Sequence, residues 1–243
     1  MSDGFMEFGF GSGDDAVGRK SEKFKGEAGR TYRVSFCWWP GIEDGKMNLD
    51  AETPKFVGAK RFYFEGVGYI IDGGPEMQKL AGNPPRLAIT TVLVLWPTNN
   101  KGAIDKDRLR TGDFKVLPWI FSEDKYRSFS PVHAEFPFSH HDLTIQCTDS
   151  KFQKMTFSPC RDNLLRKMTE KDAASEHVAR IIADTQRIIG NIRGEIGREM
   201  NLDTLREKLG HGGGGGGGGG AATASGSSGA TADIDALVDD ILD

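Results

Sequence analysis

Basic and aromatic side chains alternate in several short stretches of this 243-residue chain. In the run KRFYF at 60–64, a strand would place Arg61 and Tyr63 on one face and Lys60 with the two phenylalanines on the other. Cations that follow phosphates and planar rings that stack on bases bind single-stranded nucleic acid without sequence preference. The candidate nucleic-acid-binding residues are Trp38, Trp39, Lys60, Arg61, Tyr63, Arg86, Lys125, Tyr126, Arg127, Lys151, Phe152 and Lys154.

Core packing is the alternative for each of these rings. Trp38 and Trp39 follow a candidate strand, and two adjacent indoles are not expected to face the core together. We therefore favour ligand contact for Trp39, and also for Tyr63, Tyr126 and Phe152. For Phe62, Phe64 and Trp96 the two interpretations are evenly balanced.

Motifs for catalysis or cofactor binding are not evident. The chain has no G-x-x-x-x-G-K-[ST] and no G-x-G-x-x-G between a strand and a helix. The run HHD at 140–142, with Cys147 and Cys160, matches no standard zinc spacing, so a polar turn before the strand at Leu143 is favoured. The sequence predicts a binding protein with no catalytic residues, no metal and no cofactor.

The net charge of −4 hides an asymmetry along the chain. Residues 221–243 carry five aspartates and 1–15 carry four acidic residues, and neither segment has a Lys or Arg. Residues 16–220 therefore have a net charge of +5. A mildly basic body with acidic ends is compatible with a nucleic-acid partner.

The pattern from about residue 28 to 157 predicts a mainly β body. Candidate strands are 31–36, 60–64, 69–71, 87–96, 114–120, 143–147 and 152–157. Glycine, proline and aspartate separate them, and no strand–helix–strand alternation appears. An antiparallel barrel or sandwich is expected.

After Pro159 the apolar period changes to that of a helix. An isoleucine-rich stripe runs from Val178 to Ile192, and Ser175 is a plausible N-cap. Packing of this stripe against the β body is favoured, and self-association through it is the alternative.

The C-terminal end combines a linker with an amphipathic segment. Residues 212–220 are nine consecutive glycines, and small residues follow to 232. Beyond them, apolar residues at i, i+3, i+4, i+7 and i+8 form one helical stripe, with aspartates on the other faces. So short a helix is expected to fold on docking to a partner. The candidate partner-binding residues are Asp233, Ile234, Asp235, Leu237, Val238, Asp239, Asp240, Ile241, Leu242 and Asp243.

A basic-aromatic β body, a glycine-rich linker and a short acidic tail together resemble the single-stranded DNA-binding proteins of bacteria and bacteriophages. The segments FCWWPG and HDLTIQCTDSKFQKMTFSP further resemble the replication-associated binding proteins of tailed phages. The resemblance implies an OB-fold body and a tail that recruits replication or recombination proteins. It departs from the family at the C-terminus, because this chain ends Asp-Ile-Leu-Asp without a terminal phenylalanine.

The resemblance divides the chain into five parts. These are a flexible arm at 1–20, an OB-fold-like domain at 21–160, a helical extension at 161–210, a linker at 211–232 and an acidic tail at 233–243. The expected function is non-sequence-specific binding of single-stranded DNA in phage replication, recombination and repair. A phage assembly protein that uses its flexible ends for protein contacts is the alternative, and a small-substrate enzyme is a more distant one.

The expected compartment is the cytoplasm, or the host cytoplasm if the chain is phage-encoded. The longest apolar run, 87–96, is too short to span a bilayer, and the first fifteen residues lack a secretion signal. Three cysteines at 37, 147 and 160 argue against a disulfide framework. No membrane partner is expected.

Overall fold

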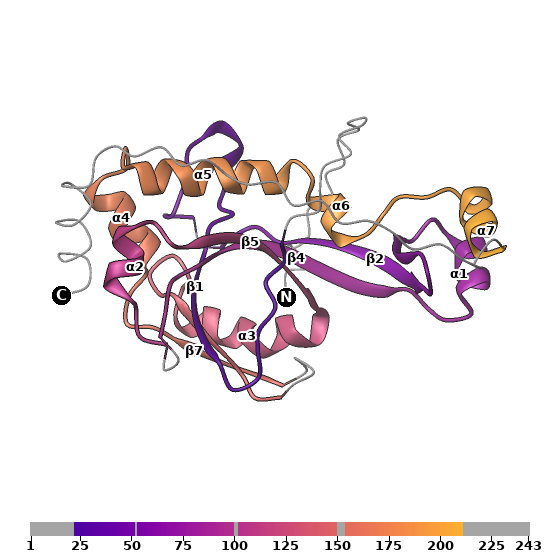
Figure 1. The fold of residues 1–243 in the computed structure, drawn as a ribbon, viewed down its shortest axis with the longest axis horizontal. Helices are drawn as coiled ribbons and strands as arrows, with labels where there is room; N and C mark the ends of the chain where they lie inside the picture. The colour runs from indigo at the N-terminus through magenta and orange to yellow at the C-terminus, as the bar shows by residue number, and fades with distance from the viewer. Residues whose placement is uncertain (1–21, 52, 100–101, 150–153, 211–243) are drawn as a thin grey trace.

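The computed structural model of the chain describes residues 22–51, 53–99, 102–149 and 154–210. These residues form one seven-stranded sheet in which every strand pair is antiparallel. The strands are β1 (Thr31–Phe36), β2 (Val57–Phe64), β3 (Gly68–Ile71), β4 (Arg86–Leu95), β5 (Lys115–Ser122), β6 (Leu143–Cys147) and β7 (Met155–Pro159). The prediction of a mainly β, antiparallel body is confirmed. The sheet is open, however, not a closed barrel (Figure 1).

Several helices pack around the sheet. They are α1 (Pro75–Ala81), α2 (Lys106–Arg110), α3 (Glu123–Glu135), α4 (Leu164–Lys171), α5 (Glu176–Ile189), α6 (Ile192–Ile196) and α7 (Leu202–Gly210), with a 3-10 turn, η1, at Ile42–Asp44. Within the described ranges, none of them is long and apolar enough to cross a bilayer.

Strand β4 is the centre of the sheet. Its residues 88–95 pair with β5 on one edge. Its other edge is shared, because 86–90 pair with β2 and 93–95 pair with β1. A strand that is covered on both faces must be apolar on both, which explains the uninterrupted run of buried residues from Ala88 to Val94. Helix α5 lies along one face of the sheet, and α3 lies on the other side (Figure 1).

The face of the sheet toward α3 encloses an aromatic core. The Trp119 ring stacks on Phe129 of α3 with centroids 5.3 Å apart, and Phe36 stacks on Phe138 at 4.5 Å. Phe24 approaches Trp119 edge-on from the segment before β1. Such aromatic pairs stabilise a core beyond the area that they bury.

Asp142, the last residue of the HHD run, is fully buried at the centre of a polar network. Its carboxylate accepts from Arg33 Nε at 2.7 Å, from the Ser35 hydroxyl and from the Leu164 backbone N–H at 3.2 Å. Ser35 in turn accepts from the Trp96 indole N–H at 2.7 Å. Burial raises the pKa of Asp142 to about 6, against the opposing effect of Arg33. These four hydrogen bonds link β1, the residue that follows β4 and the start of α4.

The β2–β3 hairpin extends away from the body and carries a second, smaller core (Figure 1). Phe62, Phe64 and Ile70 face Met77 of α1 and Leu205 of α7. We call this projection, β2–β3 with α1 and α7, the hairpin arm. Before α7 the chain passes beside β3, where the backbone of Arg198 forms hydrogen bonds with the backbone of Tyr69 and Ile71.

Helix α5 is buried along its apolar stripe. Val178, Ile181 and Ile188 are at most 2% exposed, and Ser175 caps the helix through the Val178 N–H, as expected. Packing against the β body therefore accounts for the burial of the isoleucine-rich stripe. The helix ends at Gly190, and α6 follows as a separate turn.

Candidate nucleic-acid interface

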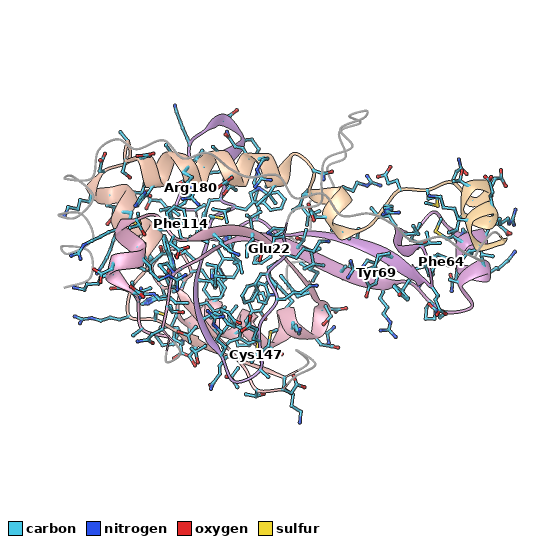
Figure 2. The ribbon with its side chains drawn as sticks, viewed as in Figure 1. Glu22, Phe64, Tyr69, Phe114, Cys147 and Arg180 are labelled. Carbon is cyan, nitrogen blue, oxygen red and sulfur yellow. The ribbon has the colours of Figure 1, made fainter. Side chains whose placement is uncertain are left out.

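The outer face of the hairpin arm carries an exposed pair of tyrosines. Tyr63 on β2 pairs across the hairpin with Tyr69 on β3, with ring centroids 5.2 Å apart. They are 61% and 48% exposed, whereas the other aromatic rings of the described residues are buried or half-buried. Figure 2 shows Tyr69 on the hairpin between the body and Phe64 near the tip. Exposed rings on a strand pair can stack on bases.

Two arginines lie on the same face as the tyrosines. Arg61 and Arg86 are directly opposite each other in the β2–β4 ladder, and cross-strand partners project to one side. The Arg61 guanidinium carbon is 3.8 Å from the centre of the Tyr69 ring. Partial burial lowers the pKa of Arg61 but leaves it a cation near neutral pH, and Arg86 is exposed.

The alternation predicted for residues 60–64 is confirmed. Phe62 and Phe64 are at most 6% exposed in the core of the arm, and Tyr63 lies on the opposite face. Lys60 is exposed on the phenylalanine side, paired in register with Leu87. We call the face that carries Arg61, Tyr63, Tyr69 and Arg86 the tyrosine face. Lys60 lies on the opposite face of the hairpin.

The interpretation of Trp38 and Trp39 as stacking residues is wrong. Trp39 is fully buried and donates its indole N–H to the Phe36 carbonyl at 2.6 Å. Trp38 is 6% exposed and donates to Glu43 at 3.3 Å. Strand β1 ends at Phe36, so the alternation of a strand does not extend to these two indoles and both turn inward. Trp96 is likewise a core residue, at 1% exposed.

Three of the candidate residues, Lys125, Tyr126 and Arg127, lie on α3, and they do not form a stacking surface. The Tyr126 ring packs edge-on against Phe56 and Phe129 at 5.6 and 5.4 Å, and burial raises its pKa. Ligand contact through the face of this ring is therefore not supported. Lys125 is half-buried with a pKa lowered by desolvation, and Arg127 is exposed in an ion pair with Glu123.

The remaining predicted residues lie far along the sheet or outside the described ranges. Lys154 is exposed just before β7, at the opposite end of the strand order from β3. Lys151, Phe152 and the whole tail, 233–243, lie outside the described residues. The structure thus brings Arg61, Tyr63 and Arg86 together, and adds Tyr69, which the sequence analysis did not select.

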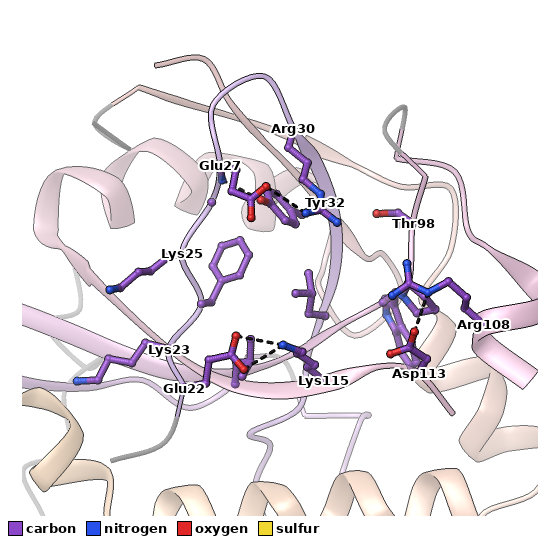
Figure 3. A pocket seen from close by; sticks show the side chains of 16 residues that line it. Glu22, Lys23, Lys25, Glu27, Arg30, Tyr32, Thr98, Arg108, Asp113 and Lys115 are labelled. Atoms are coloured by element: carbon purple, nitrogen blue, oxygen red, sulfur yellow. Dashed lines mark hydrogen bonds and ion pairs between the residues drawn. The ribbon is translucent and has the colours of Figure 1, made fainter. Parts of the chain in front are cut away.

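A cavity of about 670 Å³ opens between the segment 22–27, which we call the strap, and the adjoining parts of β1, β4 and β5 (Figure 3). Phe24, Tyr32, Trp96 and Leu117 supply its apolar lining. Ion pairs lie around it: Lys115 with Glu22 at 3.0 Å, Arg108 with Asp113 at 2.7 Å, and Arg30 with Glu27 at 3.1 Å. The signal that could have found this site is the basic-aromatic run Lys23-Phe24-Lys25.

The tyrosine face and the cavity can both interact with a ligand through aromatic rings and charged groups. Within the described ranges, no group of three or more His, Cys, Asp or Glu residues is arranged to hold a metal ion. The three cysteines are free, and burial raises the pKa of Cys37 to about 12. Comparisons with protein-family models, with curated proteins and with solved structures found no match for this chain.

Proposed function

We propose that this chain binds single-stranded DNA without sequence preference, through the tyrosine face of the hairpin arm. The observation that carries the proposal is the exposed Tyr63–Tyr69 pair with Arg61 stacked on it. An exposed patch of neighbouring rings is a feature of interaction sites. Two bases can stack there while Arg61 and Arg86 attract the phosphates.

Ring stacking and charge, the two interactions that this face offers, support binding without sequence preference. Tyrosine rings stack on any base and guanidinium groups attract any phosphate, because every base has a π-face and every linkage has the same charge. An arginine can also read guanine through a bidentate pair of hydrogen bonds. The Arg61 guanidinium is instead stacked on Tyr69 and bonded to the Ile196 carbonyl, so its donors are already engaged.

The segment before β1 supports an OB-like body. The strap bonds β5 through the Phe24 N–H to the Pro118 carbonyl at 3.0 Å, and Gly29, which follows the strap, donates its N–H to the Cys147 carbonyl at the end of β6 at 2.9 Å. Residues 22–29 thereby connect β5 with β6, which do not pair with each other. An OB fold is itself a partly open five-stranded barrel that binds oligonucleotides.

A role in phage replication, recombination or repair extends the proposal beyond DNA binding. It rests on the resemblance of the tail, in which the apolar stripe of Ile234 to Leu242 would dock into a groove on a partner protein. The aspartates between them would favour a basic rim around that groove.

The test of the proposed binding is a comparison of DNA forms. A fluorescently labelled oligo-dT and a duplex of equal length are titrated with the full chain, and anisotropy is recorded at several salt concentrations. We expect tighter binding to oligo-dT, and a linear fall of log affinity with log salt from phosphate contacts. Equal or tighter binding to the duplex would contradict the proposal.

A further inference from the structure

The cavity beneath the strap has the size and the lining of a nucleotide site. Its volume of about 670 Å³ is within the range of small-molecule pockets. Phe24, Tyr32 and Leu117 line the cavity and are each at most 7% exposed, so the structure holds them in place. The charged groups stand around this apolar lining (Figure 3).

The cations around the cavity are held by weak ion pairs. Lys115 and Glu22 are 55% and 66% exposed, and the Arg108–Asp113 pair is similarly open to water. Ion pairs this exposed contribute little to stability. A phosphate could therefore replace the carboxylate at Lys115 without a large loss of fold stability.

The strap also joins the cavity to the hairpin arm. Lys23 donates to the Glu195 carbonyl and forms an ion pair with the Glu195 carboxylate at 3.4 Å. Arg61 donates to the next carbonyl, that of Ile196. Two cations, one from the strap and one from the tyrosine face, thus meet at consecutive residues of α6.

These contacts remove the negative charge that would otherwise separate the two sites. The carbonyls at the C-terminal end of a helix and the Glu195 carboxylate would repel a polyanion, and Lys23 and Arg61 neutralise them. Lys25 projects from the outer side of the strap (Figure 3). It is exposed and forms no ion pair with another described residue.

We propose that the strap cavity is a second nucleotide subsite for the same DNA strand, continuous with the tyrosine face. This inference rests on the proposed function. The strand runs from Tyr63 and Tyr69 past Arg61 and over the strap beside Lys25. One nucleotide enters the cavity, with its base against Phe24 and Tyr32, and its phosphate takes the place of the Glu22 carboxylate at Lys115.

The exchange of a carboxylate for a phosphate predicts opposite effects of two substitutions. Lys115→Ala removes a phosphate contact, so affinity for an oligo-dT of about 16 nucleotides should fall about five- to tenfold. The slope of log affinity against log salt should shrink by about 0.7. Glu22→Gln removes the competing carboxylate, so affinity should rise. Lys25→Ala should weaken binding and reduce the slope without disturbing an ion pair.

A matched control is available on the arm. Lys79 and Glu76 of α1 form an exposed ion pair 73% and 59% open to water, on the helix that packs against the phenylalanine side of the hairpin. Lys79→Ala and Glu76→Gln change the net charge by the same amounts as the two cavity substitutions. They should alter affinity much less if the cavity is a subsite.

Oligonucleotide length separates the two sites. An oligo-dT of about 4 nucleotides can be held by the tyrosine face alone, so Lys115→Ala should leave its affinity unchanged while Tyr63→Ala weakens it. If the cavity substitutions match their α1 controls at both lengths while Tyr63→Ala still weakens binding, the subsite is contradicted and the proposed function stands. If the unsubstituted chain does not bind oligo-dT, both are overturned. Thermal melting of each variant checks that the fold is retained.

Discussion

The guanidinium carbon of Arg61 lies over the Tyr69 ring, 3.8 Å from its centre, and the same guanidinium donates to the Ile196 carbonyl of α6. One side chain therefore links the exposed ring to the body of the protein. A ring held from one side loses less conformational entropy when a base stacks on its other side. The relationship indicates that the tyrosine face is organised before a ligand binds.

Substitutions of Arg61 should separate ring organisation from charge. Arg61→Lys keeps the charge but cannot stack as a plane, so affinity for oligo-dT should fall with an unchanged salt slope. Arg86→Ala, on the same face, removes charge without touching the ring and should lower the slope by about 0.7. Anisotropy titrations at several salt concentrations measure both quantities. A loss of slope in Arg61→Lys would argue against the organising role.

Trp39→Ala should destabilise the fold. The ring is fully buried and its N–H is bonded to Phe36, so the loss of packing should cost about 3–5 kcal/mol of unfolding free energy. Urea unfolding followed by circular dichroism measures this cost. A variant that keeps its stability but loses oligo-dT affinity would restore the stacking interpretation. Since the four tryptophans are all at most 6% exposed, their fluorescence is not a direct readout of base stacking.

The buried Asp142 should make stability depend on pH with a defined sign. Its folded pKa of about 6 is above the ordinary value of 3.8, so the folded chain holds a proton that the unfolded chain has lost between these values. The contribution of this group to stability therefore falls as pH rises through about 4 to 6. Asp142→Asn cannot titrate, so the stability advantage of the unsubstituted chain over this variant should be smaller at about pH 7 than at about pH 4. Urea unfolding of both proteins at the two pH values measures it, and an advantage that grows with pH would be the contrary result.

We expect two separable effects of the acidic tail, which lies outside the described residues. Deleting 221–243 changes the net charge from −4 to +1, and affinity for oligo-dT should rise, most clearly at low salt. If residues 212–232 form the random coil that their composition predicts, the linker would span about 25 Å, enough for the tail to reach the body. Thermal stability should change little. Unaltered affinity on deletion would remove the competition between tail and DNA.

Substitutions at the apolar positions of the tail should weaken partner binding and leave DNA binding unchanged. Leu237→Asp or Ile241→Asp should abolish binding to a replication or recombination protein, measured by pull-down with purified partners. Neither substitution should weaken the competition with oligo-dT, because the aspartates remain. Retained partner binding by these variants would contradict docking through the apolar stripe.

The strands could be predicted from the sequence because their alternation is local. Residues 31–36 and 143–147 match β1 and β6, and the split of 60–64 into two faces is correct. The stacking prediction for the tryptophans at 38 and 39 was wrong because β1 ends at Phe36, and only tertiary packing shows where the chain turns. An antiparallel barrel or sandwich was predicted, but the sheet is open, and β4 shares one edge between β1 and β2, which leaves β2–β3 to project as an arm.

The candidate binding surface was only partly predictable for a similar reason. Arg61 and Tyr63 come from one strand, so their common face follows from spacing alone. Tyr69 joins them through the hairpin register, and Arg86 through the β2–β4 register. The strap cavity collects residues from 22–32, 95–98, 108–117, and no local pattern brings these segments together.

The most direct test of the account is the affinity of the double variant Tyr63→Ala, Tyr69→Ala for oligo-dT. Both rings are exposed, so the fold should survive, and Leu80→Ala on α1 is a control for loss of an exposed apolar side chain on the same arm. Each stacked base contributes about 1–3 kcal/mol, so the double variant should bind at least about 30-fold more weakly, with an unchanged salt slope. A double variant that melts like the unsubstituted chain and binds oligo-dT with the same affinity would contradict the tyrosine face as the binding surface.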